Sequence, residues 1–213
     1  MALANYSDLK TSVASWLHRT DLTAIIPDLI TAAEARFNRT LALTLMESET
    51  TLTGVVSSEF ITAPTDMQNP IALWVTNYNP RDKLTYLQPQ DLPFTTVLGY
   101  PSYWTIDSTR IKFNRPLNLA YNVTFRYYQR LQLSDASPTN FLLTNDPDLY
   151  LYGTLMEAAP YLGDDERINV WSSKYAMALK EVNDNENATK SMAILTTEVT
   201  PSYKRRFDIN RGY

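Results

Sequence analysis

Residues 164–182, DDERINVWSSKYAMALKEV, carry the most regular apolar pattern of this 213-residue chain. Apolar side chains recur along it about every three to four residues, which is the period of one helix face. These positions are Ile168, Trp171, Tyr175, Ala178, Leu179 and Val182. Asp164 and Asp165 open the segment, and acidic side chains favour a helix N-terminus. We therefore predict a helix that starts near Asp164, and the polar run 183–187 either breaks it or forms its polar face.

A second helical pattern begins at Asp146-Pro147, where Asp can cap a helix and Pro can occupy the first helical position. Its apolar positions are Leu149, Tyr152, Leu155, Met156 and Ala159. Pro160 and Gly163 are expected to end this helix.

The first 45 residues also have helical period. Ser7 before Asp8 offers an N-cap, and the first helix is expected to end near Thr20. In the next segment Asp21 is a cap and Pro27 fits only a first turn or a kink. Its predicted buried stripe is Ile26, Leu29, Ile30, Ala33 and Phe37, and its predicted solvated face is Glu34, Arg36 and Arg39.

From about residue 50 the apolar period changes from near 3.6 to near 2, which is typical of strands. The expected strands are Thr51–Thr53, Glu59–Thr62, Ile71–Val75, Tyr103–Ile106, Arg110–Phe113 and Asn122–Tyr128, with a turn at Asp107-Ser108. Seven prolines between residues 60 and 120 exclude long helices there, and only Gln88–Leu98 is expected to hold a helical turn. A small antiparallel sheet or sandwich is predicted.

This order predicts an α+β chain, in which N- and C-terminal helices form one helical bundle around an inserted small antiparallel β domain. We expect N-terminal helices over 1–48, the β insertion over 49–140, C-terminal helices over 141–200, and an extended C-terminal arm over 201–213.

Composition excludes several classes of function. The chain has no cysteine and a single histidine, His18, so neither a thiolate nor a histidine-based metal site is expected, and no cofactor is predicted. It has no signal peptide and no apolar run of membrane-spanning length, so a cytosolic protein without membrane contact is expected. The net charge is −4, with +3 in residues 201–213 and −7 in the rest, and an acidic body argues against a dedicated nucleic-acid binder.

Carboxylates are the remaining source of acid–base chemistry. The possible groups are Asp146, Asp148, Glu157, Asp164, Asp165 and Glu166. Most of them stand where a helix begins, which the helix dipole explains without catalysis, and Glu157 is expected to pair with an arginine. No catalytic residue is therefore assigned. Two alternatives stay open: a carboxylate-dependent hydrolase of cell-wall glycan that acts during entry, and a sheet-based carbohydrate-binding module.

Aromatic residues are concentrated in two places. The helical spacing of Tyr150, Tyr152, Tyr161, Trp171 and Tyr175 favours packing between helices over a stacking platform. The C-terminal segment instead mixes cations with aromatic rings and has no period. Because such residues anchor interfaces, it is predicted to order on binding. The residues expected to bind are Tyr203, Lys204, Arg205, Arg206, Phe207, Arg211 and Tyr213.

Several motifs, taken in order, resemble the head-to-tail adaptor family of tailed phages, particularly short-tailed phages. They are Tyr6–Leu9, Ala33–Arg39 with Glu34 and Arg36, Gly99–Tyr103, Ile111–Phe113, Pro116, Phe125–Tyr128, Asn140–Leu143, Pro147–Gly153 with Tyr150 and Tyr152, Glu157-Ala158, Asp164–Arg167, Trp171 and Tyr175.

This resemblance implies a structural virion protein, assembled in the host cytoplasm and located at the head–tail interface. It implies a ring of about twelve copies that joins the portal protein to a tail or nozzle protein and lets double-stranded DNA pass without sequence-specific binding. It also implies that residues 203–213 bind the portal.

Overall fold

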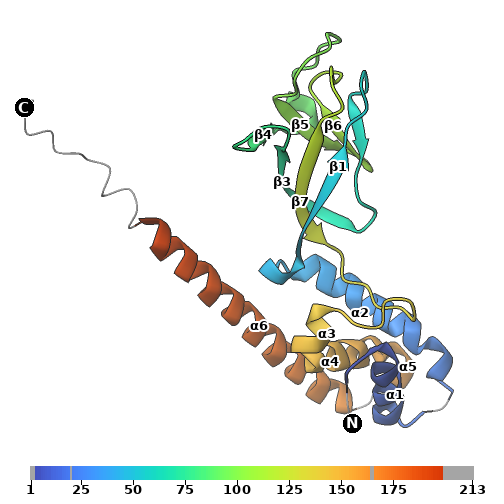
Figure 1. The fold of residues 1–213 in the computed structure, drawn as a ribbon. Coiled ribbons are helices and arrows are strands. Elements are labelled where there is room, and N and C mark those ends of the chain that lie inside the picture. Colours follow the sequence, from blue (N-terminus) through green and yellow to red (C-terminus); the bar gives the residue numbers. More distant parts are fainter. Residues whose placement is uncertain (1–2, 20, 164–165, 199–213) are drawn as a thin grey trace, which may run out of the picture. The chain divides into compact units, whose positions relative to one another are not determined.

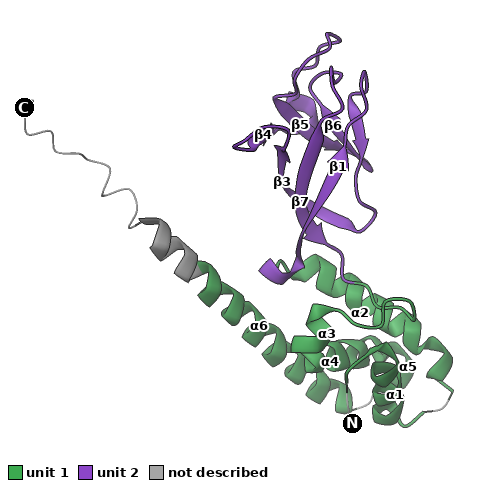
Figure 2. Ribbon diagram, viewed as in Figure 1, with its two compact units in different colours: residues 1–43, 132–213 green, residues 44–131 purple. Residues whose placement is uncertain are grey.

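The computed structural model describes residues 3–19, 21–163 and 166–198, and for residues 191–198 the backbone alone. These residues form helices and one seven-stranded sheet. The mixture of helices and sheet (Figure 1) confirms the predicted α+β class. The chain divides into a helical unit, residues 1–43 with 132–213, and a β unit, residues 44–131 (Figure 2). The β unit is therefore an insertion, and the chain crosses between the units twice.

The helical unit is organised around α4. Its elements are α1 (Tyr6–Leu17), η1 (Thr23–Ile25), α2 (Ile26–Thr40), α3 (Phe141–Asn145), α4 (Pro147–Glu157), α5 (Ala159–Leu162) and α6 (Arg167–Glu198). Helix α4 packs against α1, α2, α3 and α6. Because neighbours surround it, its buried residues are not confined to one stripe: Leu149, Tyr150, Leu151, Gly153, Thr154 and Leu155 are all buried.

Helix α1 differs at both ends from the prediction. Asn5, not Ser7, is the N-cap, because its side chain accepts a hydrogen bond of 2.9 Å from the Asp8 N–H. The helix ends at Leu17 rather than near Thr20. His18 follows in the left-handed conformation, with φ 53°, and its N–H donates to the Ala14 carbonyl.

Helix α2 has the predicted buried stripe. Ile26, Leu29, Ile30, Ala33 and Phe37 are all buried, and Pro27 lies in the first turn as expected. The predicted cap at Asp21 is wrong, because η1 separates this residue from the helix and Asp21 instead pairs with Arg19 at 2.5 Å.

The start and end of α4 also differ from expectation. Asp146 occupies the N-cap position without a side-chain capping bond. The helix ends at Glu157, and Pro160 stands in the first turn of α5 rather than ending α4. Proline is tolerated there because the first helical N–H groups have no partner within the helix.

Helix α6 buries Trp171, Tyr175, Ala178 and Val182 against the unit. It then continues through residues 183–187 without a break. The Asn183 side chain donates to the Leu179 carbonyl at 2.9 Å, so it bonds to its own helix instead of competing with it. Glu186 and Lys190 add an ion pair one turn apart, at 3.1 Å. The polar run is therefore the solvated part of one helix.

The β unit forms a curled sheet in the order β1-β7-β3-β4-β5-β6-β2. Its strands are β1 (Glu47–Thr53), β2 (Phe60–Thr62), β3 (Met67–Val75), β4 (Asp82–Tyr86), β5 (Tyr103–Asp107), β6 (Arg110–Phe113) and β7 (Asn122–Gln129), with 3-10 turns η2 (Thr44–Met46) and η3 (Pro89–Asp91). The predicted hairpin turn is present, with Ser108 at φ 57°. Strand β4 was not expected, and it pairs in parallel with β5 in an otherwise antiparallel sheet.

The core of the β unit lies inside this curl. Trp104, Phe113 and Phe125 are almost completely buried, and the Trp104 Nε1–H donates to the Leu84 carbonyl at 3.3 Å. That bond satisfies the polar atom of the indole, so the ring is buried without an unpaired donor. The β unit therefore has a hydrophobic core of its own.

Candidate functional site

The motif residues of the helical unit meet where α2, α4 and α6 pack together. Tyr150 is fully buried, and its ring lies edge-on to Phe37 with centroids 5.1 Å apart. Tyr175 stacks against the same Phe37 ring at 6.3 Å. Gly153 allows this approach, because a Cβ there would lie 2.6 Å from Phe37 Cζ. Tyr150 and Tyr175 thus serve helix packing, as the spacing predicted.

An ion pair closes the same junction. Arg36 on α2 contacts Glu157 on α4 at 2.5 Å, which confirms the expected arginine partner of Glu157. The Arg36 guanidinium also lies 6.0 Å from the centre of the Tyr175 ring. The Arg36 and Glu157 side chains are 34% and 21% exposed, so this pair joins three helices at a partly solvated edge.

Glu34 does not lie on the solvated face, and this prediction was wrong. Its side chain is only 4% exposed. Its Oε1 accepts hydrogen bonds from the Leu133 N–H at 2.6 Å and from the Tyr150 hydroxyl at 3.2 Å. Burial raises the pKa of Glu34 to about 7, and the two donors oppose that rise. Burial also raises the pKa of the Tyr150 hydroxyl.

The possible catalytic carboxylates are dispersed. Asp146 and Asp148 flank the first residue of α4, and burial, followed by the charge of Asp148, raises the pKa of Asp146. Glu166 is exposed, and Asp164 and Asp165 lie outside the described residues. In the part of the chain that the structure describes, no group of three or more His, Cys, Asp or Glu side chains could hold a metal ion.

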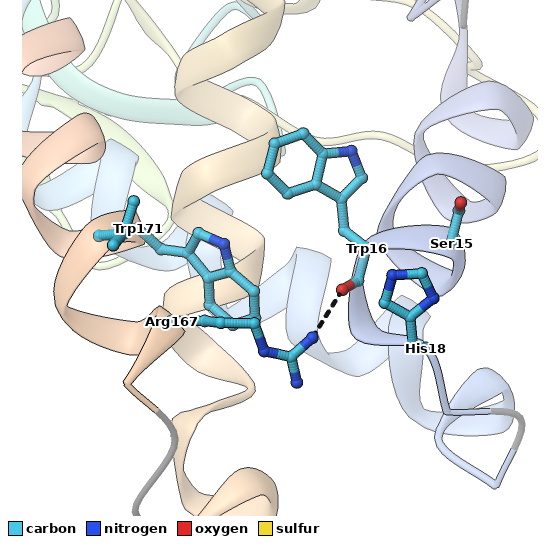
Figure 3. A pocket seen from close by; sticks show the side chains of 6 residues that line it. Ser15, Trp16, His18, Arg167 and Trp171 are labelled. Atoms are coloured by element: carbon cyan, nitrogen blue, oxygen red, sulfur yellow. Dashed lines mark hydrogen bonds between the residues drawn. The ribbon is translucent and has the colours of Figure 1, made fainter.

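A pocket of about 420 Å³ lies between the end of α1 and the start of α6 (Figure 3). Its lining consists of Ser15, Trp16, His18, Arg167, Val170 and Trp171. The Arg167 side chain spans it, since it donates to the Trp16 carbonyl at 3.2 Å and lies 5.3 Å from the Trp171 ring centre. Trp16 is 40% exposed and packs edge-on against Tyr152 at 5.9 Å. The pocket is therefore open and largely apolar, with the Arg167 cation reaching across it.

The other aromatic residues of the predicted stripe divide between core and surface. Trp171 is buried, Tyr152 is half-buried, and Tyr161 is 51% exposed. Val170 and Met177 on α6 are also exposed, at 58% and 59%. The helical unit therefore keeps apolar surface around and beyond the pocket, which is a common property of protein interfaces.

The β unit carries a second exposed apolar surface, which the sequence reasoning missed. Its residues are Val55, Val56, Phe94, Val97, Leu98 and Leu119, each 47% to 66% exposed. They belong to three loops that backbone hydrogen bonds hold together: Ser57 donates to Leu117 at 2.8 Å, and Gly99 donates to Pro116 at 3.0 Å. We call this surface the apolar loop cluster. The sequence did contain a sign of this surface, because Val55-Val56 and Val97-Leu98 are adjacent apolar pairs in segments that have no strand or helix period.

A family model described as the SU10 adaptor protein matches residues 4–197, which include the whole β unit and most of the helical unit. The chain belongs to this family. Members are phage head-to-tail adaptor proteins, so the chain is a structural component of a phage virion, and its family implies contacts with portal and tail proteins. A search of curated proteins found no relative. No helix among the described residues is long and apolar enough to cross a membrane.

The predicted portal-binding arm comprises residues 203–213. Residues 203–213 lie outside the described residues, and they also lie outside the range that the family model matches. Their role therefore stays a prediction.

Proposed function

We propose that this adaptor forms a closed ring, of about twelve copies, that joins the portal to the tail and lets genomic DNA pass through its lumen. The observation that carries this proposal is the family match over residues 4–197. The match includes the β unit and most of the helical unit, so both parts belong to the adaptor function. The ring assembles in the host cytoplasm and acts without enzymatic chemistry.

Neighbouring copies contact each other through the helical bundle. The exposed apolar side chains around the pocket support this assignment, since Trp16, Tyr161 and Val170 are large and 40% to 58% exposed. Tryptophan and tyrosine are also the residues that most often anchor interfaces. In a closed ring this surface meets a different surface of the next copy.

The β unit contacts the next tail component through the apolar loop cluster. Six exposed apolar side chains stand on three loops that backbone hydrogen bonds join, and exposed apolar patches often mark contacts with other proteins. The arm, residues 203–213, contacts the portal, and its excess of positive charge with three aromatic rings supports this assignment.

DNA passes through the lumen without adhering to it. The acidic body, with −7 over residues 1–200, supports this proposal. Binding to DNA gains affinity when lysine and arginine release counterions from the phosphates, and an acidic lining provides no such gain.

Reconstitution with the cognate portal protein tests the ring and the arm. Purified full-length chain mixed with portal should give closed rings on the portal in negative-stain images. A chain shortened after Thr200 should bind the portal more weakly, measured by co-sedimentation, while its circular dichroism stays unchanged. Equal binding of the shortened chain would show that the arm assignment is wrong.

Point variants in the apolar loop cluster test the contact with the tail. Leu98→Asp should block addition of the tail protein to preformed portal–adaptor complexes. Thr51→Asp adds the same charge to an exposed residue of β1, outside the three loops, and it should leave tail addition intact. If both variants add the tail protein normally, the loop cluster is not the tail contact.

A further inference from the structure

The segment through which the chain returns from the β unit is held inside the helical unit at several points. We call residues 132–140 the return strap. The Tyr6 N–H of α1 donates to the Pro138 carbonyl at 2.7 Å, and Lys10 pairs with Asp135 at 2.9 Å. The pair of Lys10 and Asp135 lies at the surface, since Asp135 is 86% exposed. The contact between Glu34 and Leu133 is the buried one.

Glu34 is the only charged side chain that is buried among the residues whose side chains are described. It stands on α2, which leads into the β unit, and it binds the backbone of the return strap. One carboxyl group thus links the helix before the first crossing to the strap after the second crossing. Tyr150 on α4 joins the same node.

The hydrogen-bond partners of this node fit a neutral carboxyl group. Both donors reach Oε1, which can accept two hydrogen bonds as a carbonyl oxygen. The Asn140 side chain donates to the Tyr150 oxygen at 2.6 Å, so the phenolic hydrogen is directed toward Glu34. The backbone N–H and the phenol are both neutral donors, and they offset only part of the cost of burying a charge.

The charged groups around the node have other partners. On α1, Lys10 pairs with Asp135 of the strap and lies 4.3 Å from the centre of the Tyr6 ring. On α2, Arg36 pairs with Glu157 of α4. The Tyr6 and Tyr150 hydroxyls both interact electrostatically with Glu34, and burial raises the pKa of both hydroxyls. Both phenols therefore stay neutral near pH 7.

We propose that Glu34 is a protonation-dependent latch on the return strap. As a neutral acid it holds Leu133 inside the helical unit, and when it ionises the strap opens so that water can reach the charge. The latch controls how firmly the chain is held where it returns from the β unit. It is independent of the ring and of the portal and tail contacts proposed above.

Hydrogen exchange at the Leu133 amide measures this opening. Burial raises the pKa of Glu34 from 4.5 to about 7, and opening returns it toward 4.5. By linkage the opening constant then rises about thirtyfold between about pH 5.5 and pH 8.5. The full chain is studied by NMR over that range, with each rate corrected for the intrinsic pH dependence of exchange. The carboxyl ¹³C shift of Glu34 reports its titration in the same samples.

Glu34→Gln is the matched variant, because its amide oxygen accepts the same two bonds and its side chain does not ionise. The Leu133 opening constant should become independent of pH in this variant. Tyr150→Phe is the second variant: it removes one donor to the carboxylate, so the Glu34 titration and the opening should both move to higher pH. An unchanged pH dependence in Glu34→Gln, or a midpoint that does not rise in Tyr150→Phe, would overturn the latch.

Discussion

Replacing Gly153 by alanine tests whether α2 and α4 are packed as closely as the structure shows. Two effects oppose each other. Alanine stabilises a helix interior by about 1 kcal/mol relative to glycine. The added Cβ, however, would lie 2.6 Å from Phe37 Cζ and 3.0 Å from Phe37 Cε1. Contacts under 3.0 Å are essentially not tolerated, so either the ring or the helix must move.

Phe37 has little freedom to move. Its side chain is fully buried, with the Tyr150 ring edge-on at 5.1 Å and the Tyr175 ring stacked at 6.3 Å. Overpacking of a closed core costs about 1 to 3 kcal/mol, and the upper end applies where the neighbours are held on two sides. We expect the variant to lose about 2 kcal/mol of unfolding free energy once the propensity gain is subtracted.

Urea denaturation followed by circular dichroism at a helical wavelength measures this difference. The control is Gly153→Ala in a chain that also carries Phe37→Leu, because the smaller side chain removes the clashing ring atoms. In that background alanine should be neutral or stabilising by up to about 1 kcal/mol. If Gly153→Ala alone is as stable as the parent chain, Phe37 is not fixed against α4 and the packing argument fails.

Three further predictions concern the helical unit. Glu157→Gln should lower the free energy of unfolding by about 1 kcal/mol, because it breaks the pair with Arg36 at a partly exposed edge. A chain in which the two residues are exchanged, Arg36→Glu with Glu157→Arg, forms the pair again and should regain part of that loss in a double-mutant cycle. Asn5→Ala removes the N-cap of α1 and should lower the free energy of unfolding, measured by thermal melts, by about 1 kcal/mol. Ser7→Ala should change it by no more than about 0.5 kcal/mol. A larger loss for Ser7→Ala than for Asn5→Ala would show that Ser7 is the cap. Because the folded-state pKa of Glu34 is raised from 4.5 to about 7, the folded chain binds the proton more tightly, and stability should fall by about 3 kcal/mol as pH rises through that window. Glu34→Gln should lose this component, and a difference between the two proteins that does not vary with pH would contradict the assigned shift.

Local periodicity predicted what depends on neighbours along the chain. The stripe of α2 from Ile26 to Phe37 and the buried positions of α6 from Trp171 to Val182 were readable, because a helix face repeats within one or two turns. The β5–β6 hairpin was readable for the same reason, since its turn separates the strands by only two residues.

Predictions failed where two locally sound choices competed. Both Asn5 and Ser7 are good N-cap residues, and the choice depends on which backbone N–H groups the first turn leaves unpaired.

Strand β4 was missed for another reason. It has one buried residue, Leu84, and a single buried position gives no alternation to detect. Its parallel neighbour β5 is joined to it by a loop that includes η3, so their pairing leaves no local mark.

The sequence alone determined that the chain is α+β, that it has no cysteine chemistry, and that it resembles a phage head-to-tail adaptor, which the family match confirms. Only the tertiary structure decided that Glu34 is buried and hydrogen-bonded, because its partners Leu133 and Tyr150 lie about a hundred residues away in the sequence. A charged residue between apolar helix positions looks solvated until another segment covers it. Burial depends on contacts between distant segments, and no periodic pattern records those contacts.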